Sequence, residues 1–135
     1  MQGDEVIKFF AETLISVMQD NGTPADFLGH IGGDDFIAIT VPEKAEEISS
    51  RLIRCFDQGI KNFYNSDDWE RGYVLTVDRK GRERVFPILT LSIAIVSNEY
   101  RRIDSHWLVS EIAAELKQYA KTYPGSIYVR DRRRQ

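Results

Sequence analysis

FLGHIGGDDFIAITV, residues 27–41, consists of two short apolar segments around the tetrad GGDD at residues 32–35. Glycine adopts positive φ values without steric cost, so the pair of glycines predicts a tight turn between two strands, at residues 26–31 and 36–41. Two carboxylates would then lie at the tip of a hairpin. Because hard divalent cations prefer carboxylate oxygen, this tip is a candidate site for a metal ion and a triphosphate.

The rest of the chain alternates helical and extended patterns. Apolar residues recur at helical spacing after residue 4, after Pro42 and after Ser105, and β-type segments lie between and after these stretches. This order predicts a single α/β domain over residues 1–135, an α+β sandwich with a mainly antiparallel sheet. The expected elements are helices at 4–20, 42 to about 63 and 105–121, strands at 26–31, 36–41, 88–96 and 127–129, and an extra β-hairpin near 71–86 built from 73–77 and 84–86.

Composition narrows the class of protein. The 135 residues carry a net charge of −3 and include one cysteine, Cys55, which excludes an internal disulfide and fits a reducing compartment. We expect Cys55 to be buried as a small apolar residue. No apolar run approaches the roughly 20 residues of a membrane span, and residues 1–5 lack the features of a secretory signal. We therefore expect a cytoplasmic chain with neither membrane nor nucleic acid as a partner.

The pentad GGDDF at residues 32–36 resembles the signature of the GGDEF family, the diguanylate cyclase domains of bacterial signalling, with Asp35 where the family has glutamate. Three further landmarks occur in the family's order over nearly the whole chain. They are Gly3-Asp4 before the first helix, the segment TLSIA at residues 90–94, and Tyr119-Ala120-Lys121 followed by a glycine. The resemblance implies the ferredoxin-like nucleotide-cyclase fold.

The resemblance also implies a chemistry. Members of the family condense two GTP molecules into cyclic di-GMP across a head-to-head homodimer, with Mg²⁺ at each half-site. By position, Asp34 would act at the metal and the nucleophile, and Asp35 would assist the metal. Alternatively, Asp34 and Asp35 bind no ligand and are present only because aspartate favours turns.

Four further residues match nucleotide-binding positions of the family. Gly32 and Gly33 would let the backbone approach the phosphates, Lys121 would contact the terminal phosphates, and Asp4 would accept hydrogen bonds from the guanine edge. Each position also has a structural alternative. Asp4 can cap the first helix, and Lys121 can be a solvated lysine favoured by the helix dipole.

Departures from the pattern are as informative as the matches. The family's first strand and helix, which carry a metal-binding aspartate and a guanine-reading asparagine, have no counterpart here, so we expect an N-terminally truncated domain with an incomplete metal site. The inhibitory product site is degenerate, because the segment Thr23–Asp26 retains Asp26 and lacks the arginine. The missing strand would leave a gap near the middle of the sheet, which direct pairing of residues 88–96 with residues 36–41, or pairing across a dimer, could close.

We therefore interpret the chain as the C-terminal portion of a degenerate GGDEF-type domain, attached to an upstream sensor or receiver domain. We expect it to be catalytically weak or inactive and to act as a nucleotide-responsive or dimerising module, with GTP or cyclic di-GMP as ligand and Mg²⁺ present if nucleotide is bound. Two alternatives stay open: the chain is part of an active diguanylate cyclase, or it is a protein-interaction module without nucleotide. Trp69 and Tyr73, near the extra hairpin, either pack that hairpin onto the body or mark a partner surface.

Overall fold

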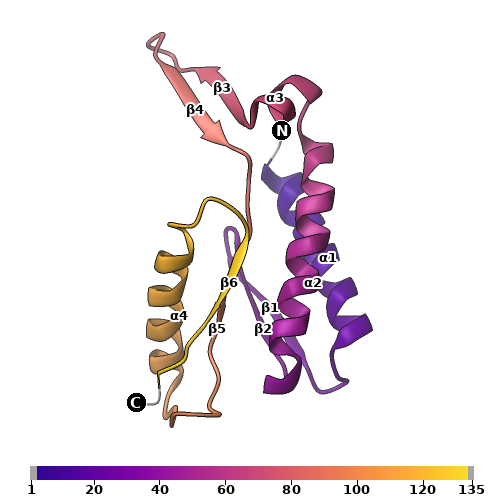
Figure 1. Cartoon of the computed structure of the whole chain (residues 1–135), viewed down its shortest axis with the longest axis vertical. Coiled ribbons are helices and arrows are strands. Elements are labelled where there is room, and N and C mark those ends of the chain that lie inside the picture. Colours follow the sequence, from indigo (N-terminus) through magenta and orange to yellow (C-terminus); the bar gives the residue numbers. More distant parts are fainter. Residues whose placement is uncertain (1–2, 134–135) are drawn as a thin grey trace.

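Helices and strands alternate along the chain in the computed structural model, which describes residues 3–133 (Figure 1). The fold is of the mixed α+β class, as the sequence predicts. In chain order the elements are α1 (Gly3–Asn21), β1 (Phe27–Gly32), β2 (Asp35–Ile39), α2 (Pro42–Ile60), the 3₁₀ helix η1 (Lys61–Phe63), α3 (Ser66–Arg71), β3 (Tyr73–Val77), β4 (Glu83–Pro87), β5 (Ser92–Ile95), α4 (His106–Ala120) and β6 (Ile127–Arg130).

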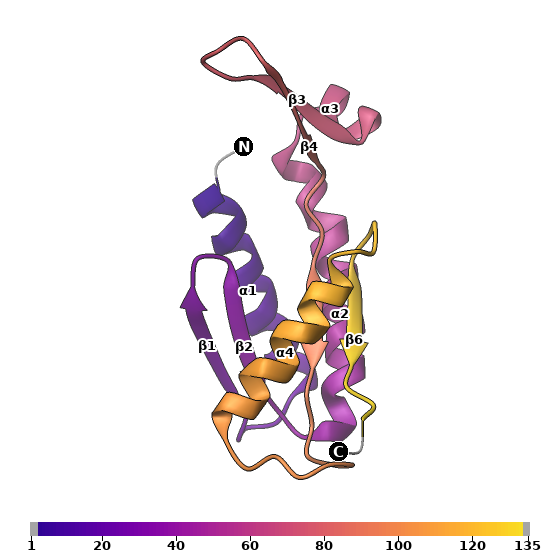
Figure 2. The ribbon, with the colours of Figure 1, turned by 90° about the vertical axis from the view of Figure 1, so that its left-hand side faces the viewer.

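The helix pair α1–α2, the strand pair β5–β6 and helix α4 lie in three successive layers (Figure 1). Helices α1 and α2 pack against each other, and strands β5 and β6 contact α2 as well as α4. Figures 1 and 2 show α4 on the opposite side of β5 and β6 from α2, with the β1–β2 hairpin running alongside α1. The β1–β2 hairpin, and with it the turn, therefore lies next to the hydrophobic core between α1 and α2.

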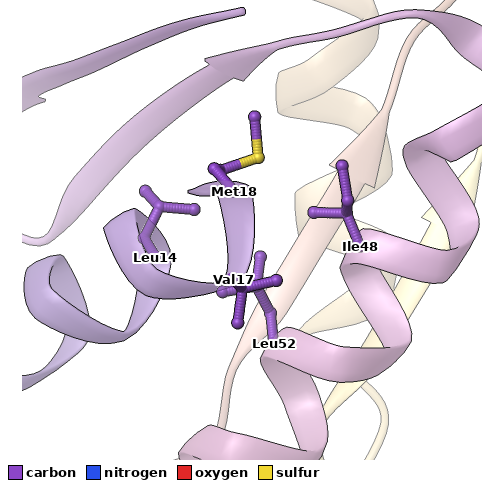
Figure 3. Packing of buried hydrophobic residues seen from close by; sticks show 5 residues of the cluster. All are labelled: Leu14, Val17, Met18, Ile48 and Leu52. Atoms are coloured by element: carbon purple, nitrogen blue, oxygen red, sulfur yellow. The ribbon is translucent and has the colours of Figure 1, made fainter. Parts of the chain in front are cut away.

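The core is built from the apolar faces that the helical spacing predicts. Leu14, Val17 and Met18 of α1 meet Ile48 and Leu52 of α2 in one buried cluster (Figure 3). A second cluster, nearer the start of α1, combines residues of the same two helices: Val6, Phe56 and Ile60. Burial of such side chains contributes about 1.5–3 kcal/mol each, so these two clusters fix the helix pair.

The strands do not form the single, mainly antiparallel sheet that the sequence predicts. Over the described range 3–133 they form three two-stranded sheets, of which β1–β2 and β3–β4 are antiparallel and β5–β6 is parallel. Helix α4 supplies the long crossover that a parallel pair needs. Within residues 3–133, β5 forms no ladder with β2, so direct pairing of 88–96 with 36–41, one of the alternatives for closing the gap in the sheet, does not occur.

The predicted nine-residue strand at 88–96 is reduced to the four residues of β5. Just before β5, the Leu91 carbonyl accepts a hydrogen bond from the Ile127 N–H of β6 at 3.0 Å, but two backbone N–H groups of this segment donate to side chains. The Leu89 N–H donates to the Tyr64 hydroxyl at 3.1 Å, and the Leu91 N–H donates to Ser126 Oγ at 2.9 Å. High hydrophobicity predicts burial of this segment, but the availability of a pairing edge decides where the strand begins.

Helix α3 replaces the polar break that the sequence predicts at residues 65–68. Asn65 caps the helix by accepting a hydrogen bond from the Asp68 N–H at 2.8 Å, and Gly72 ends it with φ of 87°. Asparagine at the N-cap and glycine in the left-handed conformation after the last turn are ordinary helix signals, which the sequence analysis missed.

Two expectations about single residues on the helices are also wrong. Asp4 lies inside the first turn of α1, so it does not occupy the N-cap position. Cys55 is exposed, although its neighbour Phe56 is buried, because consecutive residues of a helix point about 100° apart. None of the helices within residues 3–133 combines the length and apolar character that crossing a bilayer requires.

Candidate functional site

The GGDD turn joins β1 to β2 as the sequence predicts. Gly32 has φ of 148° and Gly33 has φ of 55°, both in the region that favours glycine. The pairing register shifts between His30 and Gly32, which indicates a bulge just before the turn. A Cβ atom at either glycine would meet no other atom within 4 Å, so backbone conformation, and not crowding, requires glycine here.

His30 and Phe36 attach the turn to the body. One ring nitrogen of His30, Nε2, donates a hydrogen bond to the Gly33 carbonyl at 2.8 Å, and the imidazole stacks on Phe36 with 4.3 Å between the ring centroids. Phe36 in turn packs edge-on against Phe10 of α1 at 5.0 Å between centroids. The turn is thus held to the core through two aromatic contacts, which orients the carboxylates that follow it.

Asp35 faces helix α4. The Lys117 ammonium donates a hydrogen bond to Asp35 Oδ1 at 2.5 Å, although the two residues are 82 positions apart in the chain. The hydrogen bond and positive charge of Lys117 lower the pKa of Asp35, and the charge of Lys121 adds to this effect. Lys121 is the C-cap residue of α4 and follows Lys117 by about one helical turn, so this end of α4 carries a second cation on the side of Lys117.

Asp34 differs from Asp35 in having no partner. It is exposed and forms neither a hydrogen bond nor an ion pair with any residue in the described range 3–133. The turn therefore presents one carboxylate that is already neutralised by lysine and one that is available to a ligand. Together with the two lysines they make a site of mixed charge, which we call the tip site: Asp34, Asp35, Lys117 and Lys121.

The tip site brings together some of the predicted residues and omits others. Asp34, Asp35, Gly32, Gly33 and Lys121 belong to one region, whereas Asp4 forms no hydrogen bond or ion pair with the turn among residues 3–133. Sequence reasoning missed Lys117. Its spacing of four residues from Lys121 was an available signal, but only the fold shows that this side of α4 faces the turn.

Asp26, the predicted remnant of a product site, has a local structural role. Its carboxylate accepts hydrogen bonds from the Thr23 N–H at 2.8 Å, the Thr23 hydroxyl at 2.6 Å and the Thr40 hydroxyl at 2.8 Å. The bonds from Thr23 make the largest contribution to a lowered pKa of Asp26. A Cβ on Gly22 would lie 2.1 Å from Asp26 Oδ2, so glycine at that position makes the arrangement possible.

The tip site can hold a metal only together with a ligand that completes the coordination. No cluster of three or more histidine, cysteine, aspartate or glutamate side chains suited to a metal ion occurs among residues 3–133. Mg²⁺ is commonly bound through one or two carboxylates together with substrate phosphates. Asp34 and Asp35 fit that donor set, with the remaining oxygens supplied by phosphate and water.

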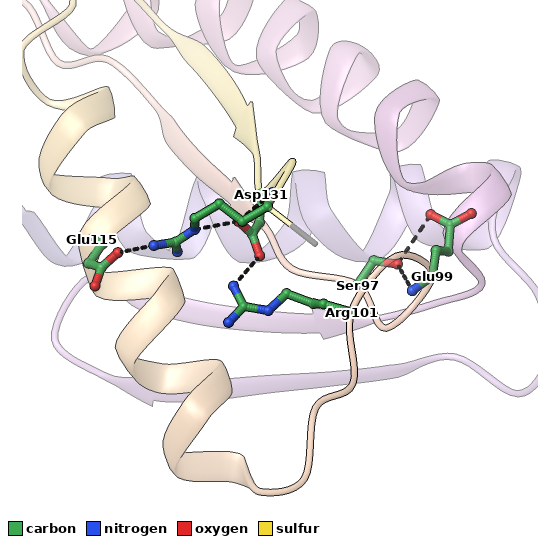
Figure 4. Close-up of polar contacts among 6 residues, drawn as sticks. Ser97, Glu99, Arg101, Glu115 and Asp131 are labelled. Atoms are coloured by element: carbon green, nitrogen blue, oxygen red, sulfur yellow. Dashed lines mark hydrogen bonds and ion pairs between the residues drawn. The ribbon is translucent and has the colours of Figure 1, made fainter. Parts of the chain in front are cut away.

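A second group of charges lies at the end of β6 and was not predicted. The buried carboxylate of Asp131 bonds Arg101 at 3.1 Å and Arg133 at 2.9 Å, and Arg133 continues to Glu115 of α4 at 2.8 Å (Figure 4). Burial alone would raise the pKa of Asp131, but the hydrogen bonds from Arg133 and Arg101 outweigh it and the pKa is lowered. We call these four residues the Asp131 cluster.

Comparisons with known proteins do not assign a family or a function to the chain. No family model, curated protein or solved structure matches the chain significantly. The functional interpretation therefore depends on the residues of the tip site and on the resemblance of its motif.

Proposed function

We propose that the tip site binds a nucleoside triphosphate, GTP by the resemblance of the motif, together with Mg²⁺, and that the chain is a degenerate GGDEF-type module of bacterial cyclic di-GMP signalling. One observation supports the proposal most directly: Lys117 of α4 pairs with an acidic turn that follows two glycines, and the charge of Lys121, at the C-cap of α4, adds to the lowering of the pKa of Asp35. An isolated acidic turn would repel phosphate. The lysines make the same location suitable for phosphate and cation together.

Each part of the tip site has a role in this proposal. Lys121 and Lys117 would bind phosphate oxygens as point charges, and Asp34, which has no other partner in the described chain, would hold the metal. Bound Mg²⁺ would offset the negative charge of the phosphates. Asp35 would have to exchange its bond with Lys117 for a bond with the metal, which its exposure to solvent permits because exposed ion pairs are weak.

We propose that the chain does not catalyse cyclisation. The site offers two adjacent carboxylates, and the described residues supply no third acidic or histidine ligand beside them. Asp35 is also one methylene shorter than glutamate, and a displacement of order 1 Å can reduce a rate by ~10²-fold. Binding without turnover would suit a module that senses nucleotide for the domains joined to it.

Calorimetric titration of the chain with GTP, in the presence and absence of Mg²⁺, tests this proposal. We expect metal-dependent binding that Asp34→Ala and Lys121→Ala each weaken at least ten-fold. The matched controls are Asp20→Ala and Lys8→Ala, two exposed residues of α1 with the same charges and no ion pair among the described residues. Binding that all four variants share would contradict a site at the turn.

Two parallel measurements separate the alternatives. Titration with ATP and with cyclic di-GMP tests the guanine preference and product binding that the resemblance implies. Chromatographic assay for cyclic di-GMP after incubation with Mg²⁺ and GTP tests for turnover, and product formation would favour the active-cyclase alternative. Absence of binding to every nucleotide at millimolar concentration would favour the interaction-module alternative.

A further inference from the structure

The hairpin of β3 and β4, with the turn between them, projects from the body of the molecule (Figures 1 and 2). We call residues 73–87 the arm. Its strands pair in register, with Leu75 opposite Val85, and the turn carries Gly81 at φ of 78°. Apart from each other, the strands make substantial contact only with α3 at the base of the arm. A two-stranded ribbon alone is marginally stable in water, so an arm of this kind gains stability from a partner.

One face of the arm is apolar and exposed. Leu75 and Val77 point to the same side because side chains alternate along a strand, and Val85 joins them because it pairs with Leu75. Their exposed fractions are 42%, 66% and 59%, respectively. Glu83, which pairs with Val77, is the charged residue at the outer end of this face. The opposite face carries the polar pair Thr76 and Arg84 next to Val74 and Phe86, of which Phe86 is 52% exposed. The apolar face therefore has the composition of a contact surface and no cover from the described residues.

Charge is separated along the arm. At its tip, Arg79 and Lys80 are exposed and form no ion pair with any residue of the described range. At its base, the same holds for the exposed Asp67 and Glu70 of α3. Arg82 and Arg84 both pair with Asp78, while Glu83 is exposed and has no ion pair with the described residues, so the charge near the tip remains positive overall. The arm thus has a positive end and a negative end with an apolar face between them.

We infer that the arm binds the arm of a second copy of this chain. The two apolar faces pack together in antiparallel orientation about a twofold axis near Leu75 and Val85. In this arrangement the positive tip of each arm lies against the negative base of its partner, so both charge contacts are attractive. A parallel arrangement would place like charges opposite each other and is disfavoured. The same patch serves both copies, as an isologous interface requires.

The charges of the arm favour a second copy of this chain over nucleic acid or a lipid surface as its partner. Nucleic acid or an anionic lipid surface would attract the tip, but it would repel the acidic base and a chain whose net charge is −3. The contact is small compared with the ~800 Å² per partner of a standard interface, so we expect a weak dimer whose population rises with protein concentration. The inference involves residues remote in sequence from the tip site and does not depend on nucleotide binding.

Sedimentation equilibrium of the chain, over micromolar to millimolar concentration at low salt, tests the inference with two charge-reversed variants. The tip variant carries Arg79→Glu with Lys80→Glu, and the base variant carries Asp67→Lys with Glu70→Lys. Each variant should self-associate at least ten-fold more weakly than the wild type, because both of its contacts become repulsive. Mixed together, the two variants should form a heterodimer, because both contacts become attractive again.

A third variant separates apolar packing from charge. Val77→Thr with Val85→Thr keeps side-chain shape and β-branching, and should weaken dimerisation at least five-fold, whereas Thr76→Ser on the opposite face should not. The matched charge control is Lys8→Glu with Arg54→Glu, two exposed cations outside the arm. Circular dichroism checks that every variant remains folded.

Three outcomes would overturn the inference. They are a wild-type chain that stays monomeric at millimolar concentration, dimerisation that the arm variants leave unchanged, and failure of the mixed variants to associate. Sedimentation with vesicles of anionic phospholipid, and with duplex DNA, identifies a different occupant if the wild type is monomeric and binds one of them through Arg79 and Lys80.

Discussion

The tip site and the Asp131 cluster both join α4 to the strands through carboxylates and cations, yet they differ in burial. The side chains of Asp131 and Arg101 are 2% and 12% exposed, whereas Asp35 and Lys117 are accessible to solvent. A buried charge that loses its partner retains its full desolvation penalty, while an exposed charge is re-solvated by water. Similar hydrogen bonds therefore make one region a fixed structural contact and leave the other free to exchange partners for a ligand.

The largest expected effect comes from breaking the buried pair. Asp131→Asn should lower the free energy of unfolding by about 3 kcal/mol, because the Arg101 guanidinium, whose Nε already lacks a hydrogen-bond partner, would lose its counter-charge in a buried position. Urea denaturation followed by circular dichroism measures the change. Asp104→Asn, in the exposed pair with Arg102, is the matched control and should have almost no effect. Equal effects of the two substitutions would contradict the contrast in burial.

Low pH should also remove the stabilisation that ionised Asp131 gives the folded protein. The pKa of Asp131 is lowered in the folded protein, so its ionised form stabilises the fold above the unfolded pKa of about 3.9. That stability is lost as pH falls through the lower, folded pKa. Denaturant titrations between pH 6 and pH 2.5, conditions chosen to bracket this range, should show a shallower pH dependence for Asp131→Asn than for the wild type. Asp35→Asn should reduce the slope less than Asp131→Asn does, because the pKa of Asp35 is also lowered but solvent screens its pair with Lys117.

At the turn, backbone conformation should matter more than the ion pair. Gly33→Ala should cost about 1 kcal/mol, because φ of 55° disfavours a residue with a Cβ atom. Gly33→Asn should cost less, since asparagine tolerates the left-handed region. Thermal unfolding of the two variants provides the comparison, and alanine as stable as asparagine at this position would argue against a strained turn.

The smallest expected effect belongs to the exposed ion pair. Lys117→Gln should change the free energy of unfolding by no more than about 0.5 kcal/mol, because solvent screens the pair with Asp35. Arg51→Gln, in the exposed pair with Glu47 on α2, is a matched control of the same kind. A loss above 2 kcal/mol for Lys117→Gln alone would show that the tip site is structural, as the Asp131 cluster is.

Of the tip site, only the residues that are neighbours in the sequence could be predicted. The Gly-Gly pair specifies the turn because the required φ values exclude most other residues, and Asp34 and Asp35 follow it in any arrangement of the fold. Lys117 was missed because its pairing with Asp35 depends on how α4 docks, which local propensity does not encode. Asp131 was missed for the same reason, since its partner Arg101 lies 30 positions away in the chain.

The same division holds for the fold. Helical periodicity, Pro42 at the start of α2 and the Ser105 cap of α4 are local signals, and the corresponding elements were predicted to within a few residues. The hairpins β1–β2 and β3–β4 were also predicted, because their strands are neighbours in the chain. The pairing of β5 with β6 was not, because it joins residues far apart in sequence and depends on which strand edges meet. The sequence by itself therefore determined the helices, the hairpins and the acidic turn, whereas only the tertiary structure decided that β5 pairs with β6 in parallel and that Lys117 bonds Asp35 of the turn.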